Sequence, residues 1–224
     1  MLKKICCAVL ALSAVPLCAQ TPTDAEQALE TIGLVRLQDV APTVQVDLAF
    51  ERDDNFAHQA FYTDIHTAYL HPQAARALQK AQEALQKTHP ELSLKVYDAA
   101  RPISVQWKLY NAVLGSDKAL YINSPKSGGD QHNYGLAVDV TLCDAATGDT
   151  LAMGTRIGDL VRESGAAVEE QVEGESTLSE EAKANRALLR RVMAVGGFKA
   201  LRNEWWHFNF RTRSEARANY RPIP

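Results

Sequence analysis

The stretch His132-Asn133-Tyr134-Gly135-Leu136-Ala137-Val138-Asp139 places an imidazole and a carboxylate at the two ends of a mainly apolar segment. A second stretch, Glu204-Trp205-Trp206-His207, adds another imidazole and another carboxylate near the end of the chain. Two histidines and one aspartate form a ligand set that can hold a catalytic zinc with one position open to water. Glu204 can take a proton from that water. The two stretches therefore predict a metal-dependent hydrolase.

The spacing of these residues sets geometric conditions on the site. We expect His132 where a loop enters a strand and Asp139 within that strand, with Gly135 allowing an unusual backbone angle or a close approach. In a straight strand, residues three apart point to opposite faces. Glu204 and His207 can therefore share a site only if a turn or bulge separates them, or if Glu204 precedes the strand.

Simpler interpretations apply to each of these residues alone. A single histidine is more often a surface or core residue than a ligand, and we keep that interpretation for His58, His66, His71 and His89. Trp205 and Trp206 alone are typical core aromatics, and Glu204 alone is typical of a salt bridge. The combination of the two stretches is what favours a metal site.

The start of the chain predicts export. Lys3 and Lys4 precede a short apolar run over residues 5–17, which is typical of a signal peptide rather than a membrane span. We expect a signal peptide over residues 1–19 and a periplasmic protein with no transmembrane span after its removal. Lipoprotein anchoring at Cys18 is the weaker alternative, because a bulky leucine precedes that cysteine.

Composition narrows the class of protein. The 224 residues, 46% apolar and 23% charged, suit one domain with a real core. Removing residues 1–19 takes away two lysines and no acid, so the formal charge goes from −3 to −3 − 2, about −5. This acidity argues against a nucleic-acid partner. Of the 4 cysteines only Cys143 follows the signal, so no intramolecular disulfide is possible, and we expect Cys143 to be buried.

The pattern of apolar residues predicts an α+β domain, a small and mostly antiparallel sheet flanked by helices. We expect a loosely held lead-in over residues 20–39 and a single domain over 40–224. The expected strands lie over residues 44–48, 92–98, 135–142 and 198–210. The expected helices lie over residues 72–88, from Pro102 to about Gly115, and from a capping box at Thr177-x-x-Glu180 to Gly196. Residues 144–176 are expected to contain a long loop beside the site.

His132-x-x-Gly135-x-Ala137-x-Asp139 with Glu204-Trp205-Trp206-His207 resembles the motifs of the VanX-type D-alanyl-D-alanine dipeptidases. These belong to a group of zinc peptidases that includes D,D-carboxypeptidases and the Hedgehog fold. Further stretches match in the same order, so the resemblance covers about Val40 to Phe210. Those stretches are Asp54-Asn55-Phe56, the Tyr62 to Ala75 region, Tyr97-Asp98-Ala99-Ala100-Arg101-Pro102, Met153-Gly154-Thr155 and Asn185-Arg186.

The resemblance implies roles for five residues. His132, Asp139 and His207 would bind one zinc ion per chain, and Glu204 would be the catalytic base. Arg101, from the Asp-x-x-Arg-Pro stretch, would stabilise the oxyanion, a role that suits a guanidinium with its fixed charge and rigid fork of donors. The simpler interpretation of Arg101 is a surface salt bridge.

Departures from the family pattern concern the substrate. Relatives commonly carry a serine two positions before the first ligand, where it helps to hold the substrate carboxylate, and here Asp130 stands there. Its charge would repel a carboxylate unless Asp130 is paired or points away. The family's Phe-Asp after Met-Gly-x-x is replaced by Ile157-Gly158. Tyr134 and Trp206, with Asp130, are the candidate substrate contacts.

Three functions follow as hypotheses. The first is a periplasmic zinc dipeptidase that hydrolyses D-alanyl-D-alanine or a similar small dipeptide by attack of metal-bound water. The second is a D,D- or L,D-carboxypeptidase that trims peptidoglycan stem peptides, which export favours and which Asp130 suits if the substrate carries a cation nearby. The third is a non-catalytic, zinc-stabilised binding module, against which the presence of both Glu204 and Arg101 argues.

Overall fold

The computed structural model describes residues 21–165 and 178–224. The signal peptide expected over residues 1–19 and Thr177 of the expected capping box lie outside this part. In the described ranges, no helix combines the length and the apolar character that a membrane crossing requires.

The core of the fold is a five-stranded sheet in the order β2-β4-β5-β7-β6. Its strands are β2 (Gln45–Val46), β4 (Leu92–Asp98), β5 (Ala137–Asp144), β7 (His207–Asn209) and β6 (Lys199–Ala200). Only the β2–β4 pair is parallel, and the other neighbours are antiparallel. A separate antiparallel pair joins β1 (Val35–Arg36) to β3 (Tyr69–Leu70). The predicted α+β class with a mostly antiparallel sheet is confirmed.

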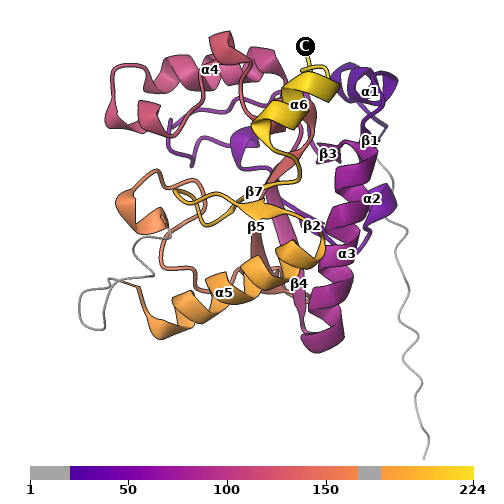
Figure 1. The fold of residues 1–224 in the computed structure, drawn as a ribbon, viewed down its shortest axis with the longest axis vertical. Helices are drawn as coiled ribbons and strands as arrows, with labels where there is room; N and C mark the ends of the chain where they lie inside the picture. The colour runs from indigo at the N-terminus through magenta and orange to yellow at the C-terminus, as the bar shows by residue number, and fades with distance from the viewer. Residues whose placement is uncertain (1–20, 166–177) are drawn as a thin grey trace, which may run out of the picture.

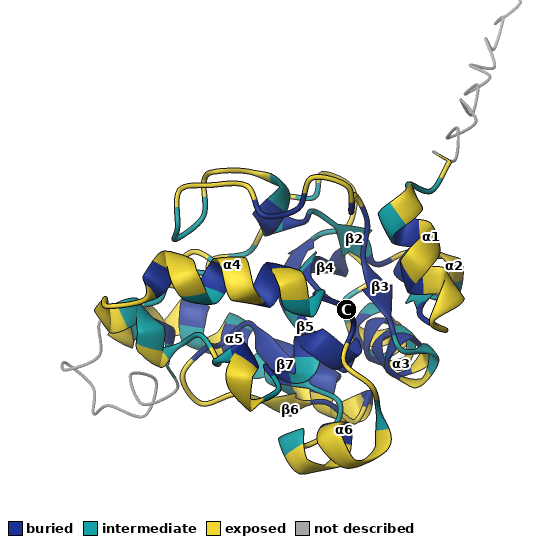
Figure 2. Ribbon diagram, turned by 90° about the horizontal axis from the view of Figure 1, so that it is seen from above, coloured by how far each residue is buried: buried dark blue, intermediate teal, exposed yellow. Residues whose placement is uncertain are grey.

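Two long helices cover one face of the sheet, α3 (Pro72–Thr88) against β4 and α5 (Glu180–Val195) against β5, and they pack on each other (Figure 1). Val138, Val140 and Leu142 of β5 are fully buried in this core, and most of this strand is dark blue in Figure 2. Because side chains alternate along a strand, Asp139 and Thr141 point to the opposite face. That face therefore remains available for a site.

The remaining elements are short and surround this framework. The helix α4 (Ile103–Val113) lies in the upper part of the view in Figure 1, away from α5. The other helices are α1 (Asp24–Thr31), α2 (Leu37–Val40) and α6 (Arg213–Asn219). Single turns of 3-10 helix are η1 (Ala49–Glu51), η2 (Asp117–Leu120), η3 (Pro125–Ser127), η4 (Gln131–Tyr134) and η5 (Arg162–Ser164).

Several expected elements match closely, and their sequences explain why. Pro72 begins α3 with His71 as N-cap, β4 covers the expected residues 92–98, and β5 overlaps the expected strand over 135–142. A proline suits the first helical turn because its missing N–H would have no partner there. Cys143 is fully buried, as expected.

Other expectations need correction. The lead-in over residues 20–39 contains α1, whose Thr23–Glu26 capping box is complete and whose Leu29 belongs to the core. The cap of α5 is Ser179, whose side chain accepts from the N–H of Ala182, so Glu180 is the first residue of the helix. The single strand expected over 198–210 is instead the hairpin β6–β7, whose chain reverses between Ala200 and His207.

Candidate metal centre and active site

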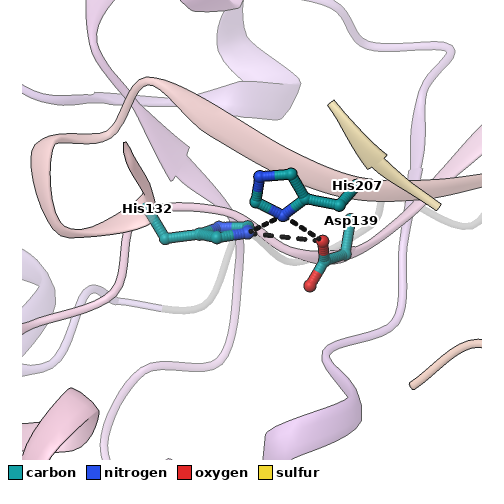
Figure 3. Close-up of side chains that lie close together, drawn as sticks. All are labelled: His132, Asp139 and His207. Carbon is teal, nitrogen blue, oxygen red and sulfur yellow. Dashed lines mark hydrogen bonds and ion pairs between the residues drawn. The ribbon is translucent and has the colours of Figure 1, made fainter. Parts of the chain in front are cut away.

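His132, Asp139 and His207 converge on one point (Figure 3). His207 Nδ1 lies 3.1 Å from both His132 Nε2 and Asp139 Oδ1, and His132 Nε2 lies 3.3 Å from that oxygen. A tetrahedral zinc with ligands at about 2.0–2.1 Å requires separations of about 3.3 Å between ligand atoms. The triangle therefore has the size that one such ion needs. Within the described ranges, these three residues form the group of histidine, cysteine or acidic side chains that lie close enough together to hold a metal. His58, His66, His71 and His89 are not part of this group.

The outer nitrogens of both rings are already engaged. His132 Nδ1 lies 2.7 Å from the carbonyl oxygen of Ala99, which can only accept, so Nδ1 carries the hydrogen. His207 Nε2 lies 3.0 Å from Asn209 Oδ1 and donates to it. The inner nitrogens then present lone pairs to each other and to a carboxylate. A positive charge between them, from a proton or from a metal ion, satisfies this arrangement, and the outer partners are of the kind that orient metal-binding histidines.

Electrostatics in the triangle support the same conclusion. Burial raises the pKa of Asp139, but His132 and His207 outweigh it and hold that pKa well below its usual range. Burial favours neutral His207, yet its hydrogen bond to Asp139 and the charge of Glu204 raise the pKa of His207 to about 9. In the metal-free protein, a proton on His207 therefore supplies the positive charge that the cluster needs.

The backbone of η4 positions His132. Asp130 caps this turn, since its Oδ1 accepts from the N–H of His132 at 3.0 Å while its own N–H donates to Asn133 Oδ1 at 2.9 Å. Gly135 ends the turn with φ +65°, and a Cβ there would lie 2.9 Å from the backbone nitrogen of His71. Both predictions made for Gly135, an unusual angle and a close approach, are confirmed.

Arg101 is buried, with 4% of its surface exposed, so the surface salt bridge is not its role. Its Nε donates to Asp98 Oδ2 at 2.9 Å and its Nη2 also contacts that oxygen. Its Nη1 donates to Gln106 Oε1 at 2.7 Å and to Asp130 Oδ2 at 3.3 Å. Nη2 lies 4.0 Å from Asp139 Oδ2, which places the guanidinium beside a candidate metal ligand.

Glu204 lies in the hairpin turn, just before β7 begins at His207. Of the two arrangements that allow Glu204 to share a site with His207, its position before the strand is therefore the one observed. Glu204 Oε2 lies 3.9 Å from His207 Nδ1. Burial, with smaller contributions from Asp139 and Asp130, raises the pKa of Glu204 to about 7. Such a carboxyl group can both accept and donate a proton near neutral pH.

Comparison with known proteins agrees with this geometry. Residues 30–220 match the family described as D-ala-D-ala dipeptidase. The chain belongs to this family. A relative from Escherichia coli (strain K12), D-alanyl-D-alanine dipeptidase, is 31% identical over 179 residues, which cover 80% of this chain and 85% of the relative. The family resemblance is thus confirmed, the protein is a peptidase, and the family's dependence on metal makes the triangle its candidate metal centre.

A cleft of about 570 Å³ opens beside Asp139 on the face of the sheet that the long helices leave free. Two segments, residues 47–56 and residues 150–158, form its walls, and Trp205 and the β5 residues Asp139 and Thr141 also line it. The long loop expected over residues 144–176 thus lines the cleft through residues 150–158. Residues 166–177 of that loop lie outside the described ranges.

Two candidate substrate contacts of this peptidase lie away from the cleft. Trp206 packs in the core with 2% of its surface exposed, and its neighbour Trp205 lines the cleft instead. Tyr134 packs with Leu136 and Ala216 in a separate small cluster, and its hydroxyl donates to the carbonyl of Gly128. Adjacent residues point in different directions, so a sequence match alone does not show which one faces a ligand.

The third candidate contact, Asp130, is paired. Burial raises its pKa, but Arg101 outweighs burial and lowers it, so the carboxylate stays charged. Of the two conditions under which Asp130 would not repel a substrate carboxylate, pairing is the one observed. Asp130 is absent from the described residues that line the cleft, and its contacts position His132 and Arg101.

Sequence reasoning assigned no role to Asp98 and Arg186, which support the site. Asp98 accepts from Tyr62 as well as from Arg101. Arg186 donates to the carbonyl of Met153, and its guanidinium lies 5.5 Å from the ring centroid of Trp205. Trp205 follows Glu204 in the sequence. A signal was present, because each is a charged residue at an apolar position of its strand or helix. Asp98 continues the alternation of Leu92, Leu94 and Val96.

The protonation of His207 predicts how metal binding depends on pH. A histidine must be neutral to bind a metal, so an incoming zinc displaces the proton from His207 at any pH below about 9. We expect release of about one proton per zinc near pH 7, and an affinity that falls about tenfold for each unit by which the pH is lowered. Calorimetry in buffers of different ionisation enthalpy measures this release. An affinity that does not change between pH 6 and 8 would contradict the assignment.

Thr141 predicts an unusual effect on stability. Its hydroxyl is buried in the cleft wall without a hydrogen-bond partner in the described part of the chain. Thr141→Val keeps the branched shape and removes an unsatisfied group, so we expect the free energy of unfolding to stay unchanged or to rise by about 1 kcal/mol. Thr67→Val is the matched control, because the hydroxyl of Thr67 donates to Gln38. Loss of that hydrogen bond should lower the free energy of unfolding by about 1 kcal/mol. Urea unfolding compares the two, and equal losses would show that Thr141 has a partner.

Proposed function

We propose that this peptidase is a zinc enzyme that hydrolyses D-alanyl-D-alanine or a similar small dipeptide. The observation that carries the proposal is the ligand triangle of His132, Asp139 and His207 with the buried carboxyl of Glu204 beside it. Membership of the dipeptidase family and the name of the Escherichia coli relative support the choice of substrate. The ligand set and its dimensions support one zinc per chain.

The chemistry divides between the metal and the chain. Zinc, when bound, polarises the substrate carbonyl and makes a coordinated water acidic. Glu204 takes the proton from the attacking water and returns it to the leaving amine, a double task that suits a carboxyl group whose pKa is about 7. His132 and His207 keep their inner nitrogens directed at the site through the hydrogen bonds that their outer nitrogens make.

Arg101 has an electrostatic role in this proposal. Asp98, Gln106 and Asp130 hold the guanidinium in one orientation, so its charge does not have to reorganise when negative charge develops on the substrate oxygen. Three acceptors already occupy most of its donors. We therefore propose that Arg101 stabilises the oxyanion mainly through its charge at the edge of the site.

The second candidate function is a carboxypeptidase that acts on peptidoglycan stem peptides. The cleft of about 570 Å³ favours it, because that space is in the range of pockets for ligands larger than a dipeptide. The argument from Asp130 no longer supports it, since Asp130 is paired with Arg101. Against the third function, a binding module, a structural zinc requires no buried carboxyl group like that of Glu204 next to its ligands.

Mass-spectrometric product analysis separates these functions. The purified zinc-loaded protein would be given a mixture of D-alanyl-D-alanine and pentapeptide stems. We expect loss of the dipeptide with intact stems. Release of D-alanine from the stems would establish the carboxypeptidase instead, and no product from either would leave the binding module.

The role of Glu204 gives a quantitative prediction. Glu204→Gln keeps the shape of the side chain and removes its ability to exchange a proton. We expect kcat to fall by about 10²–10⁴-fold while one zinc per chain is retained. Steady-state kinetics and metal analysis of the same samples measure both quantities. Near wild-type turnover by the zinc-loaded variant would rule out this mechanism.

We also propose that the protein is exported to the periplasm. Lys3, Lys4 and the apolar run over residues 5–17 support this, as the usual elements of a signal peptide. We expect the protein recovered from a periplasmic fraction to begin at Gln20. Recovery only from the cytoplasm, with residues 1–19 attached, would contradict export.

A further inference from the structure

The cleft walls formed by residues 47–56 and 150–158 differ in chemistry from the candidate metal centre. The described residues that line the cleft include two cations, Arg52 and Arg156, one on each wall. Asp54 joins them, since Arg52 Nε donates to Asp54 Oδ1 at 3.2 Å and Arg156 Nη2 donates to Asp54 Oδ2 at 3.3 Å. The two walls are 102 residues apart in the sequence at this contact.

Of these two cations, Arg156 has the guanidinium that is less engaged in hydrogen bonds. Its Nη2 contacts only Asp54, and neither its Nε nor its Nη1 makes a hydrogen bond in the part of the chain that the structure describes. Its side chain is 70% exposed, against 43% for Arg52, whose guanidinium is shared between Asp47 and Asp54. Arg101 is not an alternative binding group for a ligand in this part of the cleft, because it is buried and already donates to three acceptors.

The local backbone fixes where Arg156 begins. Gly154 has φ +83°, and a Cβ there would lie 2.2 Å from Leu178, so this tight turn requires glycine. The N–H of Arg156 donates to Asp159 Oδ2 at 3.1 Å. The backbone of Arg156 is therefore held by a rigid turn, and only the side chain of Arg156 is free to adjust to a ligand.

We propose that Arg156 binds a carboxylate of the peptide substrate and that Asp54 competes with that carboxylate for it. This inference rests on the proposed function, because it names the group of the substrate that the peptidase recognises in the cleft. A guanidinium fork matches a carboxylate, and a peptide has such a group at its C-terminus or on an acidic side chain. Arg156 makes this contact before and during the reaction, so it contributes to binding rather than to the chemical step.

The competition gives two variants with opposite effects. Arg156→Gln removes the fork, and we expect KM for a free-acid dipeptide to rise about tenfold with kcat within about twofold. Asp54→Asn removes the competing charge of an exposed pair, and we expect KM to fall by up to about fivefold. If the Arg156–Asp54 contact only joined the cleft walls, both variants would impair the enzyme in the same direction.

The substrates identify which carboxylate is bound. The assay compares D-alanyl-D-alanine, its C-terminal amide, and an amidated dipeptide with an acidic side chain. Sensitivity to Arg156→Gln for the free acid but not for its amide assigns the C-terminal carboxylate. Sensitivity for the amidated acidic dipeptide alone assigns the side-chain carboxylate. Either pattern supports the proposal, and equal sensitivity of all three substrates overturns it.

Controls separate this inference from the function on which it rests. Arg76→Gln removes the same charge from an exposed position on α3, outside the cleft, and should leave KM unchanged. Thermal melting checks that each variant folds. If the wild-type enzyme cleaves none of the peptides, the proposed function fails. If it cleaves them while Arg156→Gln and Asp54→Asn shift KM in the same direction, only the inference fails.

Discussion

The ion pair between Asp98 and Arg101 is the interaction on which the site depends. It closes the end of β4, where Asp98 is the register partner of Asp139 on β5. From that position the backbone of Arg101 bonds to the turn that carries His132, accepting from Asn133 and donating to the carbonyl of His132. The carbonyl of Ala99, between the two charged residues, fixes the His132 ring. One buried pair thus sets the positions of two of the three candidate ligands.

The balance of charge around this pair explains why a cation belongs in the centre. The carboxylates of Asp98, Asp130 and Asp139 lie within 4.0 Å of the guanidinium of Arg101, and the carboxyl group of Glu204 lies beside His207. Buried carboxylates without partners are costly, and apolar residues in their place would often be more stable. The cluster is therefore built for binding rather than for stability. The raised pKa of His207 is a response to this negative charge, chiefly that of Asp139, whereas burial is the main cause of the raised pKa of Glu204.

The sequence predicts the parts of this peptidase that depend on local pattern. The convergence of the candidate ligands, the helix after Pro72 and the strand ending at Asp98 follow from motif, proline position and alternation. It fails where tertiary contacts decide. The pattern of segment 198–210 predicts one strand, yet the chain reverses within it to form the hairpin β6–β7. This reversal lets Glu204 and His207 share a site. Tyr134 and Trp206 belong to the two motif stretches, but which residue of a stretch faces the cleft depends on packing that no local pattern encodes.

The arrangement of the cleft separates reaction chemistry from recognition. The candidate ligands Asp139 and His207 are paired across β5 and β7, and His132 is held by a reciprocal cap, so these groups are fixed by regular structure. Arg52, Asp54 and Arg156 lie on connecting segments, which tolerate change without loss of the core. Departures from the family pattern follow this division. Asp130, where the resemblance implies a serine, is held in the rigid part of the site by its ion pair with Arg101, whereas Ile157 and Gly158 lie in a loop wall. We therefore expect any difference in substrate between this chain and its relatives to originate in the two loop walls rather than in the candidate metal centre.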